Sequence, residues 1–128
     1  MKFAIQVNSS PYHTEGAHTA YQFTKAALGQ GHQIVRVFFY HDGVYNALAT
    51  AKAPDDERQP VQDWSRLADK HGVDLVVCIS AAQRRGLLLQ EASAGPTAAS
   101  ELLAPGFRIA GLGLWVEACN LADRFIVF

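Results

Sequence analysis

The feature that most constrains this sequence is the alternation of short, almost continuously apolar segments with longer amphipathic ones. The segments between the apolar runs have the spacing and end signals of helices, at about 17–28, 61–71 and 112–122, with a short helix through 81–85. Strands without polar alternation are typical of a parallel sheet that is covered on both faces. We therefore expect a three-layer α/β/α sandwich around a mainly parallel sheet. Its five strands are expected at about 2–7, 34–40, 74–79, 107–109 and 124–128.

The length and charge of the chain narrow the classes of function. No internal repeat or low-complexity tract divides the 128 residues, so we expect a single domain over residues 1–128. The formal charge of −1 gives no basic excess for holding a phosphate backbone, and strong direct nucleic-acid binding is not expected. The first apolar run is too short for a signal peptide, and no run approaches the ~18 apolar residues of a membrane span. We expect a cytoplasmic protein that does not associate with membranes.

Two cysteines are too few for a disulfide scaffold, so both are expected to be thiols in a reducing cytosol. Cys119 lies within the apolar pattern of the last helix, and we interpret it as an unreactive core residue. Cys78 stands near the end of the third predicted strand, and a helix follows it. In open parallel sheets, functional groups gather at the carboxyl ends of the strands. Cys78 is therefore the candidate catalytic residue.

The chain that follows Cys78 favours the anionic form of its sulfur. Free N–H groups and the positive end of the helix dipole lower cysteine pKa values and favour thiolate. A persulfide is also an anion and would be held by the same donors. The expected anion-stabilising residues are Ser80, Ala81, Ala82, Arg84 and Arg85. A cysteine in an apolar strand is also often a small buried hydrophobe, so the residues alone leave this second interpretation open.

Other polar residues carry weaker signals. His13 and His41 are expected at the same sheet edge as Cys78, where each either assists proton transfer or is a solvated loop histidine. No His/Cys pair has zinc-ligand spacing, and residues 55–57 (DDE) are more typical of a solvated loop than of a metal cluster. We expect no metal. Tyr12, Tyr40 and Tyr45 are candidates for lining a pocket or a subunit interface.

Several blocks of the sequence resemble the TusD/DsrE family of sulfur-relay proteins. Residues 78–86, CISAAQRRG, are similar to the cysteine segment of that family. After this segment the family tends to carry an acidic pair, whereas this chain has Leu89 and Gln90, followed by Glu91. This departure concerns the contacts that the loop makes with partner proteins. Further blocks match in order and at near-identical spacing over the whole chain: 2–7 (KFAIQV), 20–23 (AYQF), 37–47 (VFFYHDGVYNA), 111–113 (GLG), 116–118 (VEA) and 122–124 (ADR).

The resemblance implies a DsrE-like fold and a sulfurtransferase subunit. It implies that Cys78 accepts sulfane sulfur as a persulfide from a TusA-like donor and passes it to a TusE-like acceptor, without a metal or organic cofactor. It also implies a heterohexamer with TusB-like and TusC-like subunits, in a relay that ends in 2-thiolation of the wobble uridine of certain tRNAs. The DsrE branch of the family serves sulfur oxidation instead. Cys78 matches the active cysteine of the family, whereas Cys119 has no counterpart.

Two alternatives belong to other classes of protein. The chain can be a non-catalytic scaffold subunit of the same complex, with Cys78 buried and idle. It can also be a flavodoxin-like nucleotide-binding domain, which requires a phosphate loop after the first strand. Residues 8–11 (NSSP) lack the glycines of such a loop, although Ser9 and Ser10 could cradle an anion.

Overall fold

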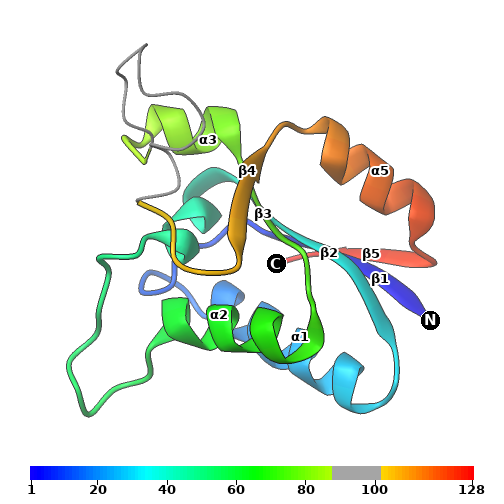
Figure 1. The fold of residues 1–128 in the computed structure, drawn as a ribbon, viewed down its shortest axis with the longest axis horizontal. Helices are drawn as coiled ribbons and strands as arrows, with labels where there is room; N and C mark the ends of the chain where they lie inside the picture. Colours follow the sequence, from blue (N-terminus) through cyan, green and yellow to red (C-terminus); the bar gives the residue numbers. More distant parts are fainter. Residues whose placement is uncertain (88–101) are drawn as a thin grey trace.

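The computed structural model describes residues 1–87 and 102–128, and Figure 1 shows strands alternating with helices along that part of the chain. Leu89, Gln90 and Glu91, where the acidic pair is replaced, lie outside the described residues. The described elements are β1 (Lys2–Val7), α1 (Gly16–Gly29), β2 (Gln33–Phe39), the 3₁₀ helix η1 (His41–Ala47), α2 (Pro60–His71), β3 (Leu75–Cys78), α3 (Ile79–Arg84), β4 (Phe107–Ala110), α5 (Gly113–Leu121) and β5 (Arg124–Val127).

The five described strands form one sheet in the order β4-β3-β2-β1-β5, and all four strand pairs are parallel. Helices α1 and α2 cover one face of this sheet and α5 covers the other (Figure 1). The predicted three-layer α/β/α architecture is therefore confirmed. No helix within the described ranges has the length and apolarity that a membrane crossing requires.

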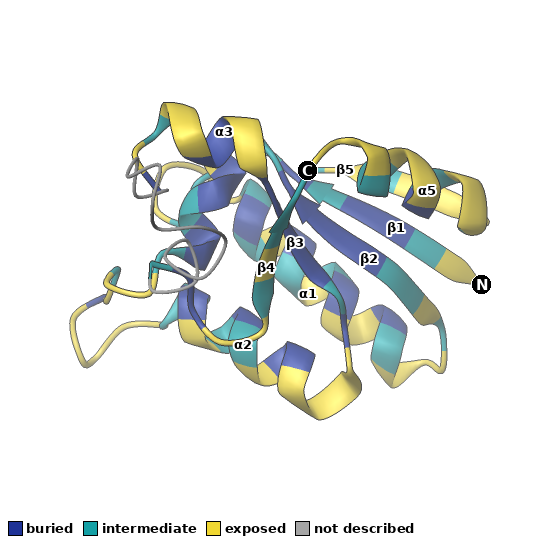
Figure 2. Cartoon of the chain, turned by 45° about the horizontal axis from the view of Figure 1, so that its top comes forward, coloured by how far each residue is buried: buried dark blue, intermediate teal, exposed yellow. Residues whose placement is uncertain are grey.

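The core lies around the three central strands, whose side chains are buried over most of their length (Figure 2). Trp64 of α2 contacts Phe39 of β2 edge-on, with ring centroids 5.2 Å apart, and contacts Tyr21 of α1 at 5.4 Å. Burial of a side chain such as Phe39 contributes about 3 kcal/mol to folding. The aromatic contacts thus join α1, α2 and the end of β2 beside one edge of the sheet.

The segment directly after β2 forms the 3₁₀ helix η1. Gly43 lies against the end of β1, where a Cβ atom would stand 1.9 Å from the carbonyl oxygen of Val7, so only glycine fits. Val44 and Ala47 are fully buried. Burial of these apolar side chains draws the segment onto the core as a helix.

Helix α5 differs from its expected pattern. Ala118 is fully buried, but Val116 is 57% exposed and Cys119 is only partly buried. Within the described ranges, α5 touches the sheet mainly at β2 and β1, so one narrow side of the helix is covered. The prediction that Cys119 is a buried core residue is therefore wrong, because its side chain is only partly buried.

A charged cluster joins β2, β3, β4 and α5. The carboxylate of Asp74 accepts hydrogen bonds from Arg36 Nε at 2.6 Å and from Arg108 Nε at 2.7 Å. Arg36 Nη1 also donates to the carbonyl oxygen of Leu114 at 2.6 Å and to Glu117 at 3.0 Å. This cluster ties the sheet to α5 through polar groups.

Candidate functional site

Cys78 lies at the carboxyl edge of the sheet, where the sequence places it. It is the last residue of β3 and the N-cap of α3, which begins at Ile79, two residues earlier than expected. Its backbone is still extended (φ −63°, ψ 121°), and the helical conformation begins at the next residue. Cys78 is 1% exposed, whereas Ile79 beside it is 44% exposed. The sulfur therefore lies directly beneath the surface.

The first turn of α3 follows Cys78 directly and contains backbone N–H groups without helical partners. Ser80 is exposed, and Ala81 and Ala82 are buried. In a helix that begins at Ile79, the N–H of Ala82 is the first to bond within the helix, which leaves those of Ser80 and Ala81 without intrahelical partners. The Cys78 side chain makes no capping hydrogen bond to them in this structure. Two N–H groups that are free of helical hydrogen bonds therefore lie within three residues of Cys78 along the chain.

The two arginines that follow occupy different positions. Arg84 is exposed in the last turn of α3, at the end away from Cys78. Arg85 turns toward η1, and its Nε donates to Asp42 of η1 at 2.8 Å. Its Nη1 donates to the carbonyl oxygen of Ala81 in α3 at 3.1 Å. We call this Asp42–Arg85 contact the brace, because it holds η1 against α3. This contact has no local sequence signal, because its partners are 43 positions apart.

The neighbouring strands complete the surroundings of Cys78. Ala110 of β4 pairs with it on one side, and on the other side the register of Phe39 with Val77 brings Tyr40 alongside. Tyr40 packs on His41, with ring centroids 4.1 Å apart. His41 has a φ of +48°, a left-handed conformation that is uncommon for residues other than glycine. His41 thus lies at the expected edge, held in an unusual backbone conformation.

The remaining candidates lie further from the sulfur. His13 and Tyr12 are exposed in the loop between β1 and α1, and Tyr45 is partly buried in η1. On α5, burial raises the pKa of the Cys119 thiol and so disfavours its thiolate. In the described ranges, no group of three His, Cys, Asp or Glu side chains is arranged to hold a metal ion. The arrangement is suited to covalent chemistry on one buried sulfur.

Two relatives that match the chain over its whole length are named for sulfur transfer. The chain is 50% identical over its whole length to the DsrE protein of Allochromatium vinosum, whose name proposes a sulfurtransferase, and covers 98% of it. It is 43% identical to sulfurtransferase TusD of Salmonella paratyphi B, with each chain covered completely. Sulfur transfer is therefore the class of activity that these relatives support.

A solved structure and a family comparison agree on the fold. The crystal structure of the ychN protein from E. coli superposes with a TM-score of 0.81, covering 100% of this chain and 99% of that one, at 21% identity. The sequence model of the DsrE/DsrF-like family matches residues 1–128. With the full-length relatives above, this match shows that the chain belongs to the DsrE/DsrF-like family.

Proposed function

We propose that this chain is a sulfurtransferase subunit that carries sulfane sulfur as a persulfide on Cys78 and passes it to an acceptor protein. The observation that carries the proposal is the place of Cys78, at the carboxyl edge of a parallel sheet and at the start of a helix. Full-length similarity to two proteins named for sulfur transfer supports it.

The transfer needs no external oxidant or reductant. The Cys78 thiolate attacks the outer sulfur of a donor persulfide, so a new S–S bond forms on Cys78 while the old one breaks and the donor thiolate leaves. An acceptor thiolate then attacks that outer sulfur, and Cys78 leaves as a thiolate. One S–S bond is exchanged for another in each step, and the reaction requires neither a metal nor an organic cofactor.

The surroundings of Cys78 have two roles in this scheme. The N–H groups of Ser80 and Ala81 stabilise the negative charge of the thiolate and of the persulfide. Burial of Cys78, at 1% exposure, protects the persulfide from thiols in bulk solution. Because a buried sulfur cannot meet a partner, transfer requires α3 to move away from η1 when a donor or acceptor docks.

The pathway and partners are part of the proposal. A TusA-like donor loads Cys78, a TusE-like acceptor unloads it, and TusB-like and TusC-like subunits complete a heterohexamer. The sulfur is used for 2-thiolation of the tRNA wobble uridine. The full-length match to sulfurtransferase TusD supports this assignment.

A second pathway is favoured by one observation. The identity to the DsrE protein, 50%, exceeds the identity to sulfurtransferase TusD, 43%. The same persulfide chemistry on Cys78 would then serve sulfur trafficking in sulfur oxidation. A scaffold subunit with an idle cysteine remains the third candidate.

Complementation separates these functions. A bacterial strain that lacks its own TusD-like subunit is supplied with the wild-type chain, Cys78→Ser or Cys119→Ser, and 2-thiouridine in its tRNA is measured by mass spectrometry. We expect thiolation to return with the wild type and with Cys119→Ser and to stay absent with Cys78→Ser. Restoration by Cys78→Ser would favour the scaffold. Failure of the wild type, with sulfur loading on Cys78 intact, would favour sulfur oxidation.

A further inference from the structure

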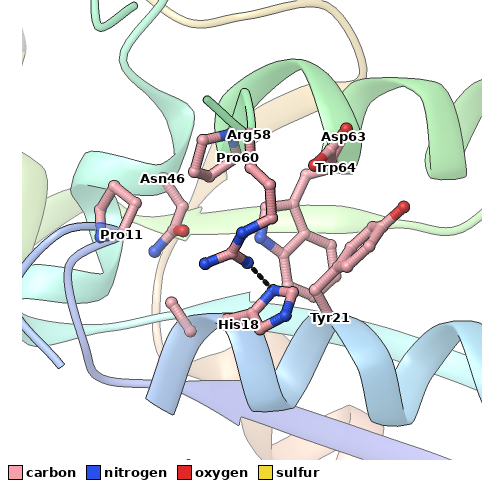
Figure 3. Close-up of a pocket in the computed structure, with 9 residues that line it drawn as sticks. Pro11, His18, Tyr21, Asn46, Arg58, Pro60, Asp63 and Trp64 are labelled. Atoms are coloured by element: carbon pink, nitrogen blue, oxygen red, sulfur yellow. Dashed lines mark hydrogen bonds between the residues drawn. The ribbon is translucent and has the colours of Figure 1, made fainter. Parts of the chain in front are cut away.

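A recess lies between α1 and α2, away from Cys78, and no step proposed above uses it. Figure 3 shows side chains from segments that are far apart in the sequence gathered around one space. The recess has room for a group about the size of one water molecule. It is lined mainly by His18 and Tyr21 of α1, Asn46 of η1, Asp63 and Trp64 of α2, and Arg58 from the loop before α2.

Asn46 brings an unsatisfied hydrogen-bond acceptor to this recess. Its side chain is fully buried, and its Nδ2 donates to the carbonyl oxygens of Ser9 at 3.0 Å and of Gly43 at 2.9 Å. These two bonds fix the orientation of the amide, which leaves Oδ1 as the free acceptor. Oδ1 is buried without a hydrogen-bond partner within the described residues. A buried acceptor of this kind is unfavourable unless a donor occupies the recess.

The other walls of the recess favour a donor that carries positive charge. The rings of Trp64 and Tyr21 form part of the wall, and aromatic faces attract ammonium groups. Asp63 also lines the recess, and its carboxylate pairs with Arg66 at 3.8 Å. An ammonium group is about as large as a water molecule, so it fits the recess and can donate to Asn46 Oδ1.

The mouth of the recess favours a negatively charged group. Arg58 reaches across it to the ring of His18 (Figure 3). Within the described residues, the guanidinium of Arg58 has no carboxylate partner. A wider hollow begins here, which shares Pro11, Arg58 and Pro60 with the recess and is also lined by Tyr12 and Glu57. A carboxylate in this hollow would pair with Arg58 in the bidentate geometry that guanidinium prefers.

We propose that this cleft binds a free α-amino acid. The ammonium group enters the recess and donates to Asn46 Oδ1, beside the rings of Trp64 and Tyr21. The carboxylate accepts from Arg58 at the mouth, and the side chain extends into the wider hollow. The zwitterion matches the arrangement of charges, with an acceptor inside and a cation outside, and the site is independent of Cys78.

Nuclear magnetic resonance titration of the full ¹⁵N-labelled chain tests this site. Glycine is compared with acetate, which lacks the ammonium group, and with methylamine, which lacks the carboxylate. We expect glycine to shift the Asn46 side-chain amide and the Trp64 indole resonances saturably. Acetate and methylamine should bind at least about tenfold more weakly, because each loses one charge-assisted contact. Larger amino acids then define the preferred side chain.

Variants locate the contact. Arg58→Gln should weaken glycine binding at least about tenfold. Lys52→Gln removes the same charge from the same exposed loop without lining the recess, and it should leave binding unchanged. The proposal is overturned if glycine causes no saturable shift, which would leave a single bound water as the partner of Asn46. Equal affinity for acetate or methylamine, or an unchanged affinity in Arg58→Gln, would overturn it as well.

Discussion

At the scale of single residues, the two cysteines occupy contrasting positions. Cys78 is buried at a strand-to-helix junction with backbone donors beside it, whereas Cys119 is partly buried within α5. Only the first position lies at a helix N-terminus, the kind of place that lowers cysteine pKa values in proteins. The chemistry assigned to Cys78 therefore depends on its place in the fold, since both residues carry the same thiol.

The reactivity of Cys119 can be predicted from its surroundings. Burial raises the pKa of this thiol, so its thiolate forms only at higher pH than in free cysteine. In the Cys78→Ser variant, we expect the rate of alkylation by iodoacetamide to rise with pH and to reach its midpoint above that of free cysteine. A midpoint at or below the free cysteine value would contradict this account of Cys119.

At the scale of elements, η1 packs against both β3 and α3, the strand and helix that meet at Cys78. Gly43 fixes η1 against β1, and the Asp42–Arg85 brace fixes it against α3. The first contact is steric and sits in the core, while the second is an ion pair with Asp42 59% exposed. Movement of α3 is therefore easier than movement of η1.

Loosening the brace should expose Cys78. An ion pair this exposed contributes up to about 1 kcal/mol, so Arg85→Gln or Asp42→Asn should raise the alkylation rate of Cys78 by up to about fivefold. The rate is measured in the Cys119→Ser background. Arg84→Gln serves as the matched control, because Arg84 is exposed and takes no part in the brace. Equal rates in all three variants would show that the brace does not limit access.

The close approach of Gly43 to Val7 predicts that a side chain at position 43 destabilises the fold. A methyl group there overlaps the carbonyl oxygen of Val7, so Gly43→Ala should lower the free energy of unfolding by about 2 kcal/mol or more. At Gly29 a Cβ atom meets nothing within 4 Å, so Gly29→Ala should be neutral or slightly stabilising. Urea denaturation compares the two variants. A neutral Gly43→Ala would mean that η1 does not pack against β1 as described.

At the scale of the whole molecule, the charged cluster at Asp74 joins three strands to α5. Burial alone would raise the pKa of Asp74, but hydrogen bonds and charges from Arg108 and Arg36 outweigh it and hold this pKa below its ordinary value. A carboxyl whose pKa is lower in the folded state stabilises the fold above its unfolded pKa of about 4. That stability is lost as the pH falls through the folded value.

Removal of the Asp74 charge should therefore have a pH-dependent effect. We expect Asp74→Asn to lower the free energy of unfolding by about 2 kcal/mol near pH 7, because Arg36 is left partly buried without its carboxylate. The difference from the wild type should shrink as the pH falls below about 4. Urea denaturation at several pH values measures it, with the exposed Asp69→Asn as control. A difference that stays constant with pH would rule out the charge of Asp74 as its cause.

Much of this fold follows from local sequence patterns. Apolar runs and helix-end signals such as Gly72, which has a φ of +67°, identify the strands and helices. They also place Cys78 at the functional edge. The order of the strands in the sheet cannot be predicted from these patterns. The runs in β4 and β5 are similarly short and apolar, so nothing in them tells the two edges of the sheet apart. Contacts between distant positions, such as Arg85 with Asp42 or Asn46 with Ser9, depend on that order and have no local signal.

The exposed side of α5 has a different cause. Val116 follows a helical apolar pattern that predicts burial, yet it is 57% exposed in the single chain. Leu112 and Phe125 nearby are 48% and 63% exposed. A sequence pattern reports that a side chain is apolar without naming the surface that covers it. The proposed heterohexamer would provide such surfaces beyond this chain.

The central claim is that Cys78 carries the transferred sulfur, and intact mass spectrometry tests it most directly. The wild type, Cys78→Ser and Cys119→Ser are each incubated with a protein persulfide donor, and the mass of each chain is measured before and after a reductant. We predict one reducible sulfur atom added to the wild type and to Cys119→Ser, and none to Cys78→Ser. A sulfur atom that remains on Cys78→Ser would contradict the account.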